Sequence, residues 1–411
     1  MSALLVRWRI FSAAPHRMFF WTGALFAVVA VALWTWQQTS LFTPLAAPVL
    51  WTVPYAQAHA VLMIYGLFGF YFCGFLLTTF PRWLNAVPVP PALYGAAWAG
   101  YTLGAALCFA GLFASRGLVV GGVLALLAGH ALATWGCARV LLRTPGWPLQ
   151  QVLIVAGLAL GLLGLAAAAW SFAGGSQTAY RAARWIGLYG YVLPVVFTVL
   201  YRMVPFFTST VTPDYETRRS AAALPLFVLA LAAHGVLGFL EFPGALWLPD
   251  ALLLAVLLRE LVLWRFWRVT GPPLLLILYV ALAWFALAFA LNVGESLALL
   301  LAGAPAPPFR NAALHALTVG GFGSLLLGIS TRVTLGHSGR GLLTTRGIHA
   351  LFWGYQAVPL LRIAPDIAGY WVPALAVQGF WAGWLWVLAF GVWLLGIGPI
   401  LLRPRSDGRP G

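Results

Sequence analysis

The residues best suited to chemistry in this chain are histidines at the ends of apolar segments. His59 and His315 each begin such a segment, whereas His16 precedes one and His337 ends one. An α-helix rises about 1.5 Å per residue, so the step from His315 to His337 spans about 33 Å, close to the hydrocarbon thickness of a bilayer. Neutral imidazole is a ligand of haem iron, copper and zinc. These four histidines therefore predict metal chemistry at both faces of a membrane protein.

Helix direction groups the histidines into two pairs. His59 and His315 both begin helices that run the same way, so they are expected at one face, with His16 and His337 at the other. Zinc usually takes three or four protein ligands, and no HxxxH or HxH motif supplies a third. Two histidines on two helices suit a six-coordinate b-type haem. We therefore predict haem iron at His59 and His315, and either a second metal site or a structural cap at His16 and His337.

Glycines follow both predicted haem ligands along the chain. They are Gly66, Gly69, Gly320, Gly321 and Gly323. A face of glycines admits the close approach of a flat macrocycle, but it equally admits the close packing of two helices. Both interpretations stay open at this point.

Arginines supply further candidates. On the haem side, Arg181, Arg184 and Arg310 either pair with haem propionates or are ordinary loop arginines. At the opposite end, Arg332 and Arg202 stand near threonines in TRVTLGH and YRMVPFFT. Those two either form a polar or anion site with the nearby histidines, or extend to lipid headgroups.

The remaining ionisable residues inside apolar segments are few. Glu295 lies within one segment, and a buried carboxyl there either relays protons or is held by hydrogen bonds. His234 and His130 are expected to be hydrogen-bonded bundle residues rather than ligands, and His349 is expected at a membrane surface. No Walker loop, nucleophile elbow, GxGxxG or pair of carboxylates occurs, which excludes hydrolase, nucleotide-driven and Rossmann functions.

The elements that must position these residues are membrane helices. Of 411 residues, 62% are hydrophobic and 8% are charged, whereas a soluble domain carries about 25% charged residues. We predict an all-α, polytopic membrane protein forming one integral membrane domain over residues 1–411, with a disordered tail over about 403–411. Twelve apolar segments run near 18–36, 57–80, 92–113, 117–142, 149–172, 180–207, 220–240, 245–267, 272–302, 309–335, 345–363 and 371–402.

The basic residues indicate orientation rather than nucleic-acid binding. The net charge is +15, and all 23 basic residues are arginines in short loops at segment ends. With both termini inside, 18 arginines fall on the inner side and five on the outer side. This asymmetry predicts cytoplasmic termini and places the predicted haem near the outer, periplasmic face.

The motifs around these residues resemble those of the NnrS family of bacterial inner-membrane proteins. The most specific match is HALTVGGFGSLLLGISTRVTLGHSGR at 315–340. Supporting matches are APHRMFF at 14–20, the stretch 59–83, YRMVPFFT at 201–208 and LLR at 360–362. The resemblance implies twelve transmembrane helices, haem, copper, and protection against nitric oxide and nitrosative stress.

One departure from the family pattern bears on copper. The family's HAH-E-M stretch falls on His59, Ala60, Val61, Leu62 and Met63. The first histidine is kept, but the second histidine and the glutamate are replaced. Any copper or second metal that needs the second imidazole is therefore in doubt.

An architectural analogy concerns the catalytic subunit of haem–copper oxidases and nitric oxide reductases. That subunit also has twelve helices, with haem histidines on its second and tenth helices, as expected for His59 and His315 here. Echoes among GFLLTTFPRW, VLYRMVPFFT and GISTRVTLGH predict three four-helix repeats. By this analogy His234 falls where copper ligands lie, yet a complete three-histidine copper site is missing.

Three functions remain open. The first is a haem-containing protein of nitric oxide stress resistance, with membrane lipid, nitric oxide and an electron-transfer partner as its contacts. The second is an oxidoreductase, either a nitric oxide reductase or a quinol-linked enzyme. The third is a cofactor-free transporter with sites at broken helices.

Overall fold

The computed structural model describes residues 3–269, 272–302, 311–342, 345–369 and 371–408, and these residues form helices without a β-strand. The first half contains α1 (Ala3–Phe11), α2 (Pro15–Phe42), α3 (Tyr55–Val61), η1 (Leu62–Leu67), α4 (Phe68–Trp83), α5 (Pro91–Ala114), α6 (Arg116–Leu142), α7 (Leu149–Phe172), α8 (Gln177–Trp185), η2 (Ile186–Val192) and α9 (Leu193–Ser209). The second half contains α10 (Ala223–Phe239), η3 (Pro243–Ala245), α11 (Trp247–Leu263), η4 (Phe266–Arg268), α12 (Pro273–Ala302), α13 (Ala312–His315), η5 (Ala316–Phe322), α14 (Gly323–His337), α15 (Arg346–Tyr355), α16 (Ala357–Ala368), η6 (Pro373–Leu375), α17 (Phe380–Gly396) and η7 (Gly398–Leu402).

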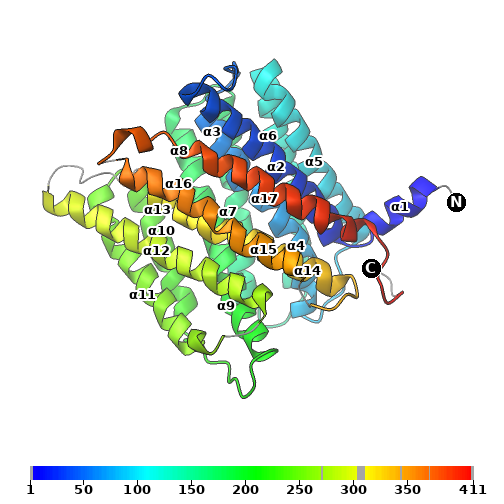
Figure 1. The fold of residues 1–411 in the computed structure, drawn as a ribbon. Coiled ribbons are helices and arrows are strands. Elements are labelled where there is room, and N and C mark those ends of the chain that lie inside the picture. Colours follow the sequence, from blue (N-terminus) through cyan, green and yellow to red (C-terminus); the bar gives the residue numbers. More distant parts are fainter. Residues whose placement is uncertain (1–2, 270–271, 303–310, 343–344, 370, 409–411) are drawn as a thin grey trace.

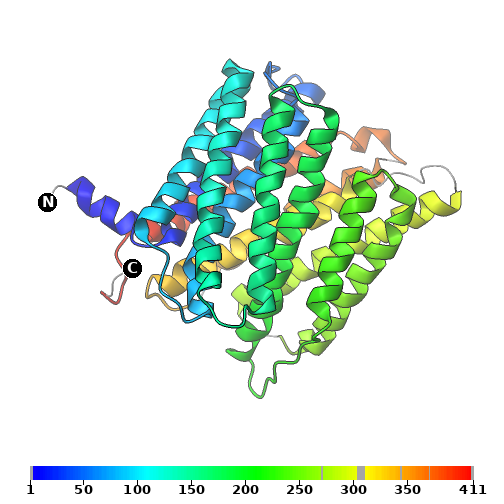
Figure 2. The ribbon, with the colours of Figure 1, turned by 180° about the vertical axis from the view of Figure 1, so that it is seen from behind.

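The helices form a bundle of membrane-spanning elements. Within the described residues, nine helical spans are long and apolar enough to cross a membrane. Three further predicted segments correspond to α10, to α11 and to the pair α15 and α16, which is interrupted at Gln356. The prediction of an all-α polytopic membrane protein is confirmed. Seen from behind, α5, α6 and α7 run side by side and are followed by the helices from α8 to α11 (Figure 2).

Three spans form the centre of the bundle, and each contains a π-helical segment. The spans are 55–83, 177–209 and 312–337. In an 18-residue apolar window of each, 89%, 78% and 72% of the residues respectively are buried, a larger share than in any other of the nine. Their π-helical segments are η1, η2 and η5, whose first residues Leu62, Ile186 and Ala316 are 124 and 130 residues apart. This spacing agrees with the prediction of three four-helix repeats, while the likeness to haem–copper oxidases stays a prediction.

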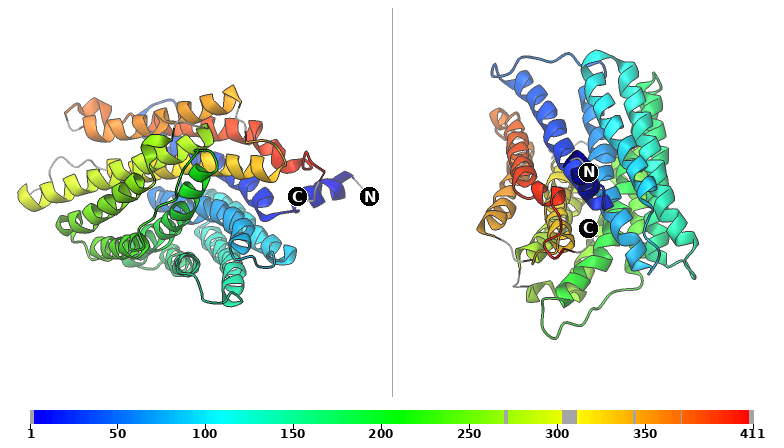
Figure 3. Two further views of the ribbon diagram at one scale, coloured as in Figure 1. Left: turned by 90° about the horizontal axis from the view of Figure 1, so that it is seen from below. Right: turned by 90° about the vertical axis from the view of Figure 1, so that its right-hand side faces the viewer.

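The two chain ends lie at the same end of the bundle (Figures 1 and 3). We call this end the terminal face and the opposite end, which carries His59 and His315, the distal face. The predicted disordered tail covers about 403–411, of which residues 409–411 lie outside the described residues. In its described part, the amide of Ser406 donates to the carbonyl oxygen of Ser338 at 2.9 Å, and Arg405 donates to the carbonyl oxygen of His337. These contacts join the segment to the end of α14, and disorder in solution stays a prediction.

Candidate functional site

The structure brings His59 and His315 to the distal face, each just before a π-helical segment. His59 lies in α3, three residues before η1 begins, and His315 is the last residue of α13, directly before η5. Both imidazoles are close enough that the charge of one acts on the other. Segments of π-helix are rare and recur at functional sites, so the placement of both histidines marks this region as a candidate site.

A carboxylate and a backbone carbonyl orient the imidazole of His315. Its Nδ1 atom lies 2.9 Å from the carbonyl oxygen of Asn311 and 3.6 Å from a carboxylate oxygen of Asp366. The same oxygen of Asp366 lies 3.0 Å from Nη1 of Arg362, four residues earlier on α16. A histidine that ligates a metal commonly directs its second ring nitrogen to such a partner. The Nε2 atom of His315 takes part in neither of these contacts.

His59 is packed against aromatic side chains. The indole of Trp34 stacks on its ring, with 4.1 Å between centroids and 17° between planes. Its Nδ1 atom is buried and has no hydrogen-bond partner among the described residues. A small cavity of about 10 Å³ adjoins the ring and is partly lined by Trp51 and Phe109. A buried imidazole nitrogen without a partner and a partner-oriented second imidazole together fit the donor set of a haem iron.

The glycines beside these histidines accommodate side chains of the protein itself. A Cβ atom added at Gly66 would lie 2.4 Å from the ring of Phe26, and one added at Gly320 would lie 2.5 Å from the ring of Trp284. These contacts explain the glycines by helix packing. They therefore give no separate support to a bound macrocycle.

The arginines predicted to hold propionates have protein partners or lie outside the described residues. Arg181 forms an ion pair with Glu241 and stands over the ring of Phe239. The guanidinium of Arg184 stands over the indole of its neighbour Trp185, 5.1 Å from the ring centroid. Arg310 lies outside the described residues. Arg362, which the sequence analysis had not selected, is the arginine that the structure places beside His315.

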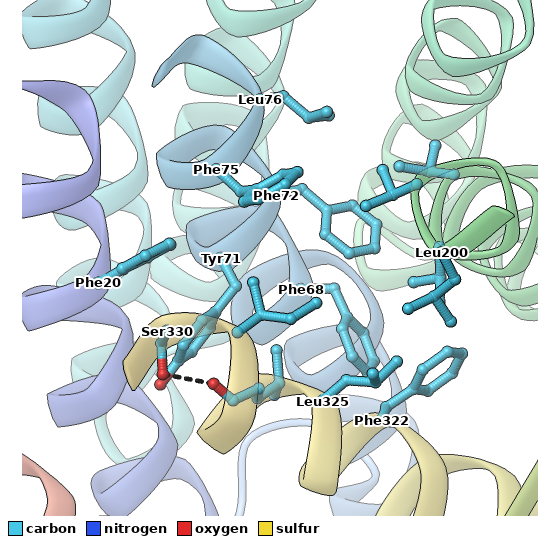
Figure 4. Close-up of a pocket in the computed structure, with 15 residues that line it drawn as sticks. Phe20, Phe68, Tyr71, Phe72, Phe75, Leu76, Leu200, Phe322, Leu325 and Ser330 are labelled. Atoms are coloured by element: carbon cyan, nitrogen blue, oxygen red, sulfur yellow. Dashed lines mark hydrogen bonds between the residues drawn. The ribbon is translucent and has the colours of Figure 1, made fainter. Parts of the chain in front are cut away.

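A mostly apolar cavity lies between the three central spans and α2 (Figure 4). Its volume is about 60 Å³, and it is bounded by aromatic rings such as Phe68, Phe72 and Phe322, with leucines and valines of α9 and α14. Its polar rim is limited to Ser330, which donates back to the carbonyl of Leu326 in its own helix, and to Tyr71. Such a lining favours small uncharged molecules over ions or water.

The other predicted pair meets at the terminal face. The ring centroids of His16 and His337 are 4.8 Å apart, and Nη1 of Arg82 lies 3.4 Å from Nδ1 of His337. The backbone amide of His16 donates to the hydroxyl of Thr78 at 3.1 Å. Near this pair, a hydrogen bond from Arg405 to the Asp407 carboxylate raises the pKa of that arginine above its ordinary value.

Two arginines assigned to this polar site point elsewhere. The guanidinium carbon of Arg332 stands 3.7 Å from the centroid of the Phe207 ring. Arg202 stands over the ring of Trp83 and donates to the side-chain oxygen of Gln150 at 3.2 Å. Cation–π contacts of this kind satisfy a partly buried guanidinium without an anion. Neither of these contacts is with His337, so the polar site shared with that histidine stays a prediction.

The remaining candidates have protein partners of their own. His130 contacts the hydroxyl of Tyr101 at 2.7 Å and the carbonyl oxygen of Leu158 at 2.9 Å. The Nδ1 atom of His234 lies 2.9 Å from Asp250. These contacts agree with their interpretation as hydrogen-bonded bundle residues.

His234 is also adjacent to a π-helical segment, because its ring stacks on that of Tyr189 of η2 with 4.0 Å between centroids.

Two further candidates, Glu295 and His349, are described by their positions in the fold. Glu295 is half-buried on α12. His349 lies in the first turns of α15.

A family model described as NnrS protein matches residues 10–405, nearly the whole chain. The chain belongs to the NnrS family. A comparison with curated proteins found no match. As an NnrS protein it is a multi-pass membrane protein related to nitric oxide stress, and the matched range contains both histidine pairs.

Asp366, Trp34 and Arg82 contact the candidate histidines but were not predicted as site residues, and the sequence indicates a role for only one of them. Asp366 is one of eight acidic residues in the chain and follows Arg362 by one helical turn, which is the spacing of an ion pair. Trp34 and Arg82 carried no such signal, because their roles depend on which helices become neighbours.

Proposed function

We propose that this NnrS protein is a haem protein of the bacterial inner membrane that protects against nitric oxide and nitrosative stress. The observation that supports the proposal is that His59 and His315 both lie at the distal face, each just before a π-helical segment, with Asp366 beside the imidazole of His315. The terminal face would be cytoplasmic and the distal face periplasmic, as the arginine asymmetry indicates. Family membership supports the link to nitric oxide.

In this proposal the imidazoles of His59 and His315 would hold the iron of a b-type haem. The carbonyl oxygen of Asn311 would fix the tautomer of His315 by accepting a hydrogen bond from Nδ1–H. The carboxylate of Asp366, held by its ion pair with Arg362, would stabilise the same side of the ring by its charge. Trp34 shields one face of the His59 ring from water. When bound, the haem supplies one-electron redox chemistry, and the protein's part is to orient the ligands and exclude solvent.

The residues also limit what can be proposed about copper. Within the described residues, no group of three or more His, Cys, Asp or Glu side chains is placed to hold a metal ion. The positions of the family's second histidine and glutamate are Val61 and Leu62. We therefore propose haem alone at the distal pair and assign no residues to copper.

The test compares purified full-length proteins by their optical spectra. Wild type, His59→Ala and His315→Ala would be examined by reduced-minus-oxidised and pyridine haemochrome spectra, with iron and copper analysis. His349→Ala is the matched control, since it removes an imidazole in the first turns of α15, away from the distal face. We expect a b-type signal in wild type and in the control, and its loss in both distal variants. A signal that survives in both would falsify the assignment of the ligands.

The same preparations separate the alternative functions. Consumption of nitric oxide with a reduced quinol or other electron donor would indicate a nitric oxide reductase or quinol-linked oxidoreductase. Spectral shifts with nitric oxide but without turnover would indicate binding, sensing or electron transfer. A wild type without haem, after expression with ample haem supply, would favour the cofactor-free transporter.

A further inference from the structure

Basic side chains gather at the terminal face, away from the proposed haem. They come from the start of α2, the end of α4, the end of α14 and the residues that follow α17. We call them the terminal-face cluster: His16, Arg17, Arg82, His337, Arg340 and Arg405. Segments more than 300 residues apart in the chain therefore converge on one small region, as the proximity of the N and C labels indicates (Figure 3).

Arg17 is a deeply buried member of the terminal-face cluster, as is its neighbour His16. It is 2% exposed, and its Nη1 atom donates to the carbonyl oxygens of Leu401 at 3.0 Å and Arg403 at 2.8 Å. Its Nε atom is buried and has no hydrogen-bond partner among the described residues, and the same holds for Nη1 of Arg340. A buried donor on a charged group is costly when it lacks an acceptor. Two N–H groups of the cluster thus lack the acceptor that their burial demands.

Among the described residues of this region, basic side chains outnumber acidic ones. His16 experiences the charges of His337, Arg17, Arg82 and Arg405, and each of these is basic. Arg17 in turn experiences Arg405 and Arg340. The carboxylate that the structure places here is Asp407, which contacts Arg405 at 2.7 Å.

Four guanidinium groups beside one carboxylate leave a strong positive potential. The first turn of α2 adds to it, because the amino end of a helix carries a partial positive charge. A divalent metal ion held by His16 and His337 would be repelled by these groups, so charge balance disfavours the second metal site that the histidine pair suggested. An anion at the same place would be attracted by every member of the cluster.

We propose that the terminal-face cluster binds a phosphate group at the membrane surface. The planar fork of a guanidinium matches phosphate oxygens, and charge-assisted bonds to phosphate are among the strongest that side chains make. The Nε atom of Arg17 and the Nη1 atom of Arg340 supply the unpaired donors. The phosphate comes either from a phospholipid headgroup or from free phosphate, since helix ends lie at the level of the headgroups.

The first experiment uses wild-type protein in detergent and needs no variant. Thermal unfolding would be followed with inorganic phosphate, with chloride at equal ionic strength, and with mixed micelles containing phosphatidylglycerol. Native mass spectrometry of the purified protein would report any phospholipid that remains bound. Stabilisation by phosphate but not chloride would identify free phosphate, whereas stabilisation or retention restricted to phosphatidylglycerol would identify a headgroup. The absence of both effects in wild type would overturn the proposal.

Variants then test whether the cluster is the site. Arg340→Gln and Arg82→Gln each remove one guanidinium, and we expect the affinity for the effective phosphate probe to fall by about tenfold or more. Arg143→Gln is the matched control, because it removes an exposed arginine that directly follows the last residue of α6 and lies outside the cluster. Equal affinity in all three variants would contradict the proposal, as would tight binding of Cu²⁺ or Zn²⁺ that depends on His16 and His337. None of these readouts depends on haem, so the proposed function and this site can fail separately.

Discussion

Replacing Gly122 by alanine should destabilise the protein, because α5 and α6 touch backbone to backbone at this residue. A Cβ atom there would lie 2.6 Å from the amide nitrogen of Cys108 and 2.8 Å from the carbonyl oxygen of Gly104. An ordinary contact begins at 3.4 Å, so the helices must separate locally by about 0.8 Å. A gap of roughly 0.5–1 Å removes a quarter to a half of the dispersion energy of the atoms that line it.

The neighbouring residue provides the control that isolates this cost. A Cβ atom added at Gly121 meets no described atom within 4 Å. Both substitutions gain the helix propensity of alanine over glycine, about 1 kcal/mol. Overpacking at Gly122 alone costs about 1–3 kcal/mol. The free energies of unfolding of the two variants should therefore differ by about 1–3 kcal/mol, with Gly122→Ala the less stable.

Unfolding in mixed micelles of a mild detergent and sodium dodecyl sulfate, followed by circular dichroism, would measure this difference. Both variants should be compared at the same protein and detergent concentrations. Equal stability of Gly121→Ala and Gly122→Ala would refute the reasoning, since it would mean that α5 and α6 do not meet at Gly122.

Three further predictions concern buried polar groups and the apolar cavity. Asp366→Asn should weaken haem retention by about 10–100-fold through loss of support for His315; an unchanged rate of haem transfer to apomyoglobin would contradict this. His130→Ala leaves the Tyr101 hydroxyl unpaired and should cost about 1–3 kcal/mol in the same unfolding assay; wild-type stability would show that this contact contributes little. Xenon under pressure should occupy the apolar cavity of the wild type, and Leu200→Trp should fill the cavity and exclude xenon. ¹²⁹Xe NMR would report both results, and a lack of xenon binding to the wild type would disprove a dry, accessible cavity.

The sequence predicted the helices well because their apolar segments are long and their ends carry clear signals. The segment placed at 92–113 is α5, Pro91–Ala114, which begins at the proline expected in a first turn. Other boundaries were less accurate, as for α2, which extends to Phe42 rather than residue 36. The interruption at Gln356 and the three π-helical segments were not predicted, because a shift of hydrogen-bond pattern by one residue leaves composition and hydropathy unchanged.

Helix direction alone was enough to group the histidines, but not to identify what surrounds them. Counting segments placed His59 with His315 at one face, and in the structure each of them directly precedes or lies three residues before a π-helical segment. The partners of these rings come from helices distant in sequence, as Trp34 and Asp366 do. Arginine contacts were the least predictable feature, because a long flexible side chain near a helix end can reach several neighbours.

The three π-helical segments connect the fold to its candidate chemistry. Each adds a residue to a turn at a corresponding position of a central span, and such an insertion weakens the regular hydrogen bonding of a helix. An isolated insertion could be an accident of packing, but η1, η2 and η5 recur at intervals of 124 and 130 residues. At each one a histidine is present: His59 before η1, His315 before η5, and His234 stacked on Tyr189 of η2. A purely structural role would not require an imidazole at every copy, so the recurrence supports these segments as the frame on which the protein's redox or binding chemistry is built.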